Sequence, residues 1–157
     1  MSESEKGVYE VLIEHPFFEG LGERYIALLA EFASYASFAP GDYLLREGEE
    51  ANSFYIITFG QVSLEMSFPG KGSVTLHTVK EGDVVGWSWL HPPYKWFLDA
   101  RAVTQVRAIA FDGRIIKAKC DEDPHLGYEL MKRFACIIAQ RLQATRLQLL
   151  DIHGASG

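Results

Sequence analysis

Residues 38–65 read FAPGDYLLREGEEANSFYIITFGQVSLE, a stretch in which short apolar runs alternate with glycine-containing turns. The pairs Pro40-Gly41 and Glu47-Gly48 are typical of turns, and Gly60 makes a third break. Between the second and third breaks, the run from Ser53 to Thr58 is rich in aromatic and β-branched residues, which favour strands. This stretch therefore predicts short antiparallel strands joined by tight turns.

The same pattern continues downstream of residue 65. Gln61–Phe68 carries apolar side chains at every second position, Pro69–Gly72 is a hairpin loop, and residues 74–78 alternate again on the return strand. Asp99–Phe111 is another β-rich region. We therefore expect a mainly β fold, an antiparallel β-roll or double-stranded jelly roll of about eight strands.

Helical patterns flank the strands on both sides. Val8–His15 and Glu23–Ala33 predict short N-terminal helices, with helix extending to about Ser34. Asp112 is a candidate N-cap, and Asp123-Pro124 is a strong helix start. A long amphipathic helix follows and is expected to end at His153-Gly154. We expect one domain over residues 1–157, comprising N-terminal helices at 1–34, a β-roll at 35–112 and C-terminal helices at 113–153.

Several of these motifs resemble one known family. Phe38–Asp42, Leu44–Glu49 and Ser53–Glu65 resemble the core of cyclic-nucleotide-binding domains of the catabolite-activator (CRP/FNR-like) family, as do Phe17–Leu21 and Gly82–Gly86. The resemblance covers roughly residues 8 to 150. It implies a regulatory small-molecule sensor that signals through a dimer and a partner protein.

The ligand cassette of that family corresponds to residues 86–102. The resemblance implies that a glutamate after the opening glycine binds the ribose and that an arginine near the end pairs with the cyclic phosphate. Here Gly86 is present, but Trp87 stands at the glutamate position. Phe97, or Trp96 if the register slips by one, stands at the arginine position, and Arg101 falls in the next strand. We therefore expect cyclic AMP and cyclic GMP to bind weakly or not at all.

Five aromatic side chains fall within this cassette. With Lys95 as a cation, they could form a pocket for a planar or apolar ligand; alternatively, they fill the old pocket and leave a ligand-free dimerisation or adaptor domain. No cofactor is required by either interpretation, and the sequence does not identify a ligand. The candidate ligand-binding residues are Gly86, Trp87, Ser88, Trp89, Leu90, Tyr94, Lys95, Trp96, Phe97 and Arg101.

The long C-terminal helix predicts a homodimer. In the resembling family this helix pairs with its two-fold mate, and its apolar stripe here approximates a coiled-coil seam. The expected dimer residues are Leu130, Phe134, Ile137, Ile138, Arg141, Leu142, Thr145 and Leu149.

Transcription factors of the family continue from this helix into a winged helix-turn-helix, whereas only residues 154–157 follow here. We therefore expect no direct DNA binding. Two alternatives stay open: a natural single-domain sensor acting on an unknown partner protein, or a fragment, the effector domain of a transcription regulator. The Met1 start favours a natural N-terminus, and the C-terminus is undecided.

Composition excludes several other functions. A formal net charge of −6 argues against general nucleic-acid binding. Neither a membrane span nor a signal peptide is present, and the two cysteines lack metal or redox spacing, so a cytoplasmic protein is expected. The five histidines are scattered, which predicts neither a metal site nor a jelly-roll enzyme of the cupin kind. No catalytic constellation is evident, and we expect a protein that is not an enzyme.

Overall fold

Within residues 7–156, eight antiparallel strands form two four-stranded sheets, which confirms the predicted β-roll. The structure, a computed structural model, describes residues 7–156, and side chains are described for residues 7–150. The ends of the predicted domain, residues 1–6 and 157, lie outside the described residues. One sheet has the order β1-β8-β3-β6 and the other β2-β7-β4-β5. The strands are β1 (Ala33–Phe38), β2 (Tyr43–Leu45), β3 (Ser53–Phe59), β4 (Gln61–Phe68), β5 (Gly72–Lys80), β6 (Val84–Val85), β7 (Asp99–Ala102) and β8 (Val106–Asp112).

The tight corner between β3 and β4 depends on Gly60. Its φ is 96°, a conformation that side-chain-bearing residues rarely adopt. A Cβ atom at this position would lie 2.2 Å from the carbonyl oxygen of Gln105. The glycine therefore allows the two sheets to meet closely at the start of β4.

Between residue 7 and the first strand the chain forms three short helical segments: α1 (Val8–Glu14), the 3-10 turn η2 (Pro16–Phe18) and α2 (Glu23–Glu31). The predicted extension of helix to about Ser34 is wrong, because β1 already begins at Ala33. The residues from Ala33 to Phe38 pair in register with β8, from Phe111 back to Val106. This long-range pairing overrides the local helical preference of the segment.

The two predicted N-caps of the C-terminal helices are confirmed. The Asp112 carboxylate accepts hydrogen bonds from the backbone N–H groups of Arg114 and Ile115 at the start of α3 (Gly113–Glu122). The Asp123 carboxylate does the same for His125 and Leu126 in α4 (Pro124–Ser156). The helix α4 runs past the predicted end at His153 to Ser156, and residues 151–156 are described only as backbone.

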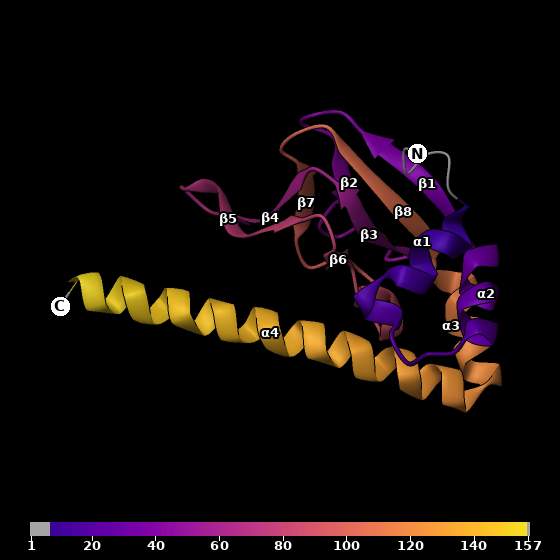
Figure 1. The fold of residues 1–157 in the computed structure, drawn as a ribbon. Coiled ribbons are helices and arrows are strands. Elements are labelled where there is room, and N and C mark those ends of the chain that lie inside the picture. Colours follow the sequence, from indigo (N-terminus) through magenta and orange to yellow (C-terminus); the bar gives the residue numbers. More distant parts are fainter. Residues whose placement is uncertain (1–6, 157) are drawn as a thin grey trace.

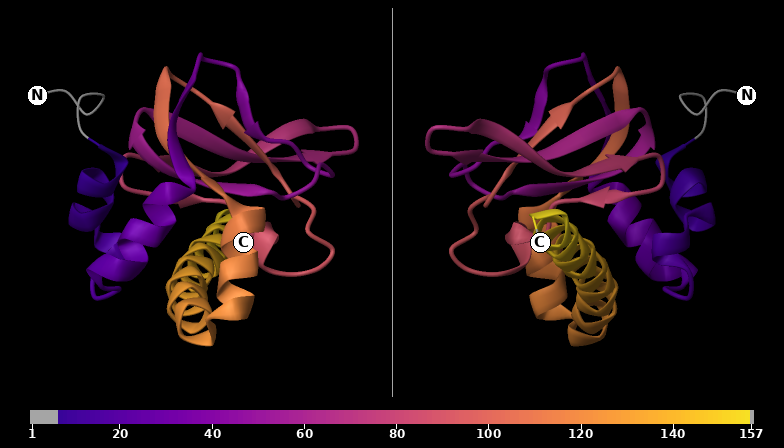
Figure 2. Two further views of the ribbon diagram at one scale, coloured as in Figure 1. Left: turned by 90° about the vertical axis from the view of Figure 1, so that its right-hand side faces the viewer. Right: turned by 90° about the vertical axis from the view of Figure 1, so that its left-hand side faces the viewer.

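The helix α4 lies along one side of the β-roll over much of its length (Figure 1). The two end-on views show the helices gathered on that side and the sheets on the other (Figure 2). Towards its C-terminal half, α4 contacts β5 through two polar bonds: Thr145 Oγ1 lies 3.2 Å from His77 Nε2, and Gln148 Nε2 donates to Leu76 O at 2.8 Å. The helix is therefore docked on its own β-roll well beyond its first turns.

A cluster of aromatic rings joins the β-roll, the cassette and α4. The rings of Phe54 and Phe111 stack with centroids 4.4 Å apart, and Trp89 stacks on Phe54 at 5.0 Å. Phe134 of α4 meets Phe54 edge-on at 5.2 Å and Trp89 at 5.5 Å. The position of the cassette is thus coupled to the position of α4 through packed side chains.

Candidate functional site

Backbone hydrogen bonds hold the cassette loop against residues 48–51. After β6 the chain passes Gly86, forms the 3-10 turn η3 (Ser88–Leu90) and returns through a loop to β7. Within this loop Trp96 accepts from Gly48 N–H at 3.0 Å and donates to Glu49 O at 3.1 Å, and Tyr94 O accepts from Ala51 N–H at 2.7 Å. The loop is therefore a fixed part of the structure.

The cassette side chains face two separate cavities instead of one. The inner pocket, as we call it, is lined by Leu45, Leu64, Val85, Gly86, Trp87, Ser88, Trp96, Phe97, Leu98 and Arg141. The outer pocket is lined by Glu50, Ala51, Trp89, Pro93, Tyr94, Lys95, Gly113, Arg114 and Lys117. The prediction that all the aromatic rings share one pocket with Lys95 is therefore wrong. Leu90 lines neither cavity and packs against the core.

The inner pocket occupies the place between the β-roll and the cassette, and the chain itself nearly fills it. Its volume is about 40 Å³, far below the roughly 300–1,000 Å³ typical of small-molecule sites. Trp96 is only 6% exposed, and its indole packs so closely on Gly86 that a Cβ there would lie 3.0 Å from the ring. In this conformation the inner pocket has no room for a nucleotide.

Arg141 of α4 is the cation of the inner pocket. Its guanidinium carbon lies 5.1 Å from the centroid of the Trp87 ring, a cation–π contact, and it donates a hydrogen bond to Val84 O. Among the side chains of residues 7–150, no carboxylate forms an ion pair with Arg141. Burial without such a partner lowers the pKa of Arg141 to about 10. The inner pocket is therefore a small apolar space with one positively charged wall.

Arg141 was predicted in the dimer seam but lies in the inner pocket, whereas Lys95 lines the outer pocket and not the pocket that holds Trp87, Trp96 and Phe97. The signal that could have located Arg141 is its spacing. It continues the series Leu130, Phe134 and Ile137 at intervals of four and three residues along the side of α4 that meets the core.

Arg101 does not belong to either pocket, and its prediction as a ligand residue is wrong. Its guanidinium donates hydrogen bonds to both carboxylate oxygens of Glu65 on β4, with Nη2 2.7 Å from Oε2. Glu65 is 3% exposed and also accepts from the Ser73 hydroxyl at 3.1 Å. The hydrogen bonds from Arg101 lower the pKa of the Glu65 carboxyl. The pair is part of the sheet.

Stability should depend on pH through Glu65. The pKa of Glu65 is lower in the folded state than in the unfolded state, where it is about 4.3. The ionised carboxylate therefore contributes to the free energy of unfolding above about pH 4.3, and this contribution is lost as pH falls through the folded pKa. At pH 7 we expect Glu65→Gln to lower the free energy of unfolding by about 1.5–3 kcal/mol, and we expect this difference to shrink by pH 3. Urea unfolding at both pH values measures it. The control is Glu81→Gln, because Glu81 is exposed. If the loss of unfolding free energy in Glu65→Gln were the same at pH 7 and pH 3, the lowered pKa of Glu65 would be contradicted.

The predicted dimer stripe of α4 divides between two sides of the helix. Leu130 and Phe134 are 0% and 1% exposed, so their prediction as seam residues is wrong: they are already covered by the core of their own chain. Ile137 also packs against that core. The exposed apolar residues of this region of α4 include Met131, Ile138, Leu142 and Leu149.

The remaining candidate chemistry lies apart from the pockets. Among the described residues no three His, Cys, Asp or Glu side chains come together as metal ligands. Burial raises the pKa of Cys120 to about 11, whereas Cys136 is exposed. Within the described part of the chain, none of the helices has the length and apolarity needed to cross a membrane.

Comparisons with known proteins agree with this architecture. A model of the cyclic nucleotide-binding domain matches residues 35–123. A CRP-like cAMP-activated global transcriptional regulator of Mycobacterium tuberculosis is 25% identical over 143 residues, which are 91% of this chain and 62% of that protein. The chain thus spans less than two thirds of the length of the curated relatives it matches.

Solved structures are similar over most of the chain. A putative cyclic nucleotide-binding protein from Geobacter metallireducens has 27% identity and a TM-score of 0.77, covering 85% of this chain and 96% of that one. The regulatory subunit of a cAMP-independent protein kinase A from Trypanosoma cruzi, bound to guanosine, has 25% identity and a TM-score of 0.62, covering 76% and 47%. Because the family model matches more than half of the residues, the chain belongs to the cyclic nucleotide-binding domain family.

Proposed function

We propose that this protein is a regulatory small-molecule sensor without catalytic activity, in which occupation of the inner pocket is transmitted to α4. The observation that carries the proposal is the position of Arg141, which belongs to α4 and forms a wall of the inner pocket. A ligand that moved Arg141 off Trp87 would act directly on the helix. Phe134 adds a second connection, because it packs against the Trp89 ring of the cassette.

The ligand of this sensor is proposed to be something other than cyclic AMP or cyclic GMP. Trp87 and Phe97 stand where the family's ribose-binding glutamate and phosphate-binding arginine are expected, and Trp96 occupies much of the space. The Trypanosoma cruzi relative is itself described as cAMP-independent and bound to guanosine. That description supports the idea that the fold can hold a different ligand.

One experiment tests the sensor directly. Protein purified under native conditions is denatured, and the released small molecules are identified by mass spectrometry; the compound found is then added back to ligand-free protein. We expect a rise in the melting temperature and a change in hydrogen exchange along α4. A compound that stabilises the protein but leaves α4 exchange unchanged would contradict transmission through the helix.

A ligand-free adaptor is the second candidate, favoured by the small volume of the inner pocket. It predicts that no compound co-purifies and that screening of nucleotides, aromatic acids and haem produces no thermal shift. The curated relatives are transcription regulators, so a role in transcription control through a further DNA-binding part is a third form of the proposal.

Dimerisation through α4 is part of the proposal. Met131, Ala135, Ile138 and Leu142 follow one another at steps of four, three and four residues, and Leu149 lies seven residues further on, the spacing of a coiled-coil seam. Thr145, which was also predicted for the seam, instead contacts His77 of its own chain. The first four residues of the series are exposed. They therefore present an apolar stripe that a second copy of the helix could cover.

The dimer should be sensitive to one charge in this stripe. We expect the protein to have twice the monomer mass of 17.6 kDa in analytical ultracentrifugation, and Leu142→Glu to be monomeric because a carboxylate would be desolvated at the seam. Gln143→Glu adds the same charge one residue away and should remain dimeric. A wild-type protein that is monomeric at tens of micromolar would sink this part of the proposal.

A further inference from the structure

We propose that the outer pocket is a second ligand site, which binds a small planar organic acid with two carboxylate groups. It shares no lining residue with the inner pocket, so the inference does not depend on the proposed sensor ligand. The cavity measures about 380 Å³, within the range of roughly 300–1,000 Å³ found for small-molecule sites.

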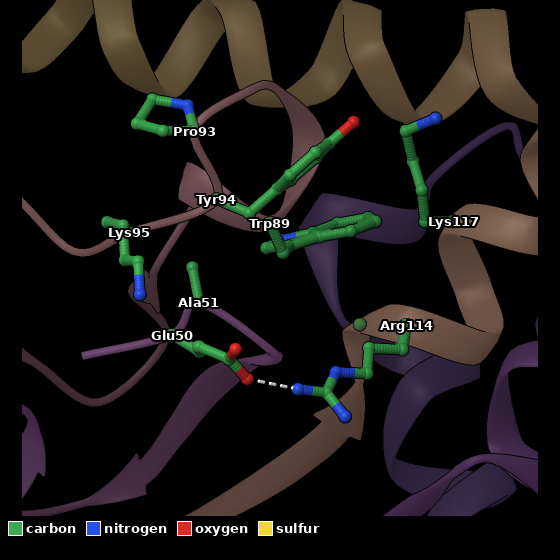
Figure 3. A pocket seen from close by; sticks show the side chains of 9 residues that line it. Glu50, Ala51, Trp89, Pro93, Tyr94, Lys95, Arg114 and Lys117 are labelled. Atoms are coloured by element: carbon green, nitrogen blue, oxygen red, sulfur yellow. Dashed lines mark hydrogen bonds and ion pairs between the residues drawn. The ribbon is translucent and has the colours of Figure 1, made fainter.

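Aromatic and apolar groups give the outer pocket a surface suited to a flat ligand. Figure 3 shows the Trp89 indole at the centre of the lining residues, between Tyr94 and the Glu50–Arg114 pair. Trp89 is 2% exposed and stacks on Phe54, so it cannot easily turn away. Gly113 permits this arrangement, because a Cβ there would lie 3.1 Å from the Trp89 side chain. The indole is therefore a rigid part of the cavity wall, and most of the accessible ring surface belongs to Tyr94, which is 40% exposed.

The charges around the outer pocket favour an anion with more than one negative group. Three cations, Lys95, Arg114 and Lys117, line it against one carboxylate, that of Glu50, in a chain whose net charge is −6. Lys95 forms no ion pair with any carboxylate among residues 7–150. A local excess of positive charge that persists in an acidic protein is a feature that a carboxylate ligand would recognise.

The other two cations, Arg114 and Lys117, can bind a ligand carboxylate at little cost in stability. Arg114 pairs with Glu50 and Lys117 with Asp121, but at least one partner in each pair is well exposed to solvent. Exposed ion pairs contribute little to stability, so a ligand carboxylate can replace Glu50 at Arg114 or Asp121 at Lys117. Arg114 and Lys117 both project from α3, whereas Lys95 comes from the cassette loop, and a ligand with two carboxylates can bridge the two segments.

The cassette side of the outer pocket is fixed in an unfavourable backbone conformation. Tyr94 has φ of 58°, a left-handed value that a bulky residue rarely adopts. Its N–H donates to His91 O at 3.0 Å, and the neighbouring Lys95 forms a β-bridge with Glu50. Strained residues that are held in place by their surroundings are common at binding sites. The backbone contacts of Tyr94 and Lys95 overcome this strain and keep both residues at the rim of the cavity.

The test uses the full chain and benzene-1,3-dicarboxylate as the probe, with binding measured by isothermal titration and by the indole N–H signals in nuclear magnetic resonance spectra. We expect saturable binding that shifts the Trp89 signal, assigned from Trp89→Phe. Loss of two charge-assisted contacts in Lys95→Gln/Lys117→Gln should weaken binding about tenfold or more. The matched control, Lys71→Gln/Lys80→Gln, removes the same charge from exposed positions outside the pocket and should retain the affinity.

Further probes separate the parts of the proposal. Benzamide, which has the ring without the charge, should bind at least about tenfold more weakly than the dicarboxylate. If inorganic phosphate binds as well as the dicarboxylate, the planar part of the ligand is wrong. If no dicarboxylate binds, or if both double variants lose affinity equally, the outer pocket is not a ligand site. None of these results bears on the inner pocket, because Lys95 and Lys117 do not line it.

Discussion

Replacement of Phe134 by alanine is expected to lower the free energy of unfolding by about 3–5 kcal/mol, the usual cost of removing a fully buried phenyl ring. Phe134 is 1% exposed and meets three other aromatic rings, those of Phe17, Phe54 and Trp89. Its loss leaves a cavity where η2, the β-roll and the cassette all meet α4. Because the rings around it are held by the backbone of three different segments, the site cannot easily collapse to fill that space.

The measurement is urea unfolding followed by tryptophan fluorescence, at a protein concentration held constant so that any dimer contributes equally. Phe68→Ala is the control, since that side chain is 41% exposed on the β4 strand and should cost about 1 kcal/mol or less. A loss below about 1 kcal/mol for Phe134→Ala would show that α4 is not docked on the aromatic cluster. It would also remove the second connection between the cassette and the helix.

The sequence predicted the β-roll well because its signals are local. The alternation in Gln61–Phe68 and the glycines at the strand corners fix where strands begin and end without knowledge of their partners. The end of α2 was missed for the opposite reason. Ala33–Phe38 becomes a strand only because β8, some seventy residues later, offers a register for it.

The candidate site was predicted in position but not in its internal arrangement. Periodicity shows that α4 has apolar positions, but not which of them the β-roll covers, and so Phe134 and Leu142 were placed in the same seam. Likewise, the number of aromatic residues in the cassette does not reveal that η3 turns Trp89 into the core while Trp87 contacts Arg141. Both distinctions depend on tertiary packing, which a single sequence does not specify.

Cyclic AMP and cyclic GMP are expected to bind at least about a hundredfold more weakly than they would with both anchoring residues present. A hydrogen bond to a charged group contributes about 1.5–3 kcal/mol, and two such contacts together correspond to a factor of more than a hundred. The positions that would supply them hold Trp87 and Phe97. Isothermal titration measures the affinity, and a dissociation constant in the low micromolar range or below would contradict this expectation.

Two causes of weak binding, missing anchors and missing space, can be separated by variants. Trp87→Glu/Phe97→Arg restores the two anchoring side chains, yet we expect its affinity to remain low because Trp96 still occupies much of the inner pocket, whose volume in the wild-type protein is about 40 Å³. Trp96→Ala alone enlarges the pocket without an anchor and should also bind poorly. The triple variant combines both changes, and we expect it to bind cyclic AMP at least about tenfold more tightly than either parent.

The triple variant also tests the role of Arg141. In the wild-type protein its guanidinium stacks on Trp87, whereas a glutamate at position 87 would offer it a carboxylate partner. If the new carboxylate at position 87 pairs with Arg141, that carboxylate no longer binds the ribose. Adding Arg141→Gln to the triple variant should then raise its affinity for cyclic AMP further. If Arg141 instead contacts the cyclic phosphate, the same substitution should weaken binding. The direction of that change distinguishes an arginine that closes the inner pocket from one that recognises an anion within it.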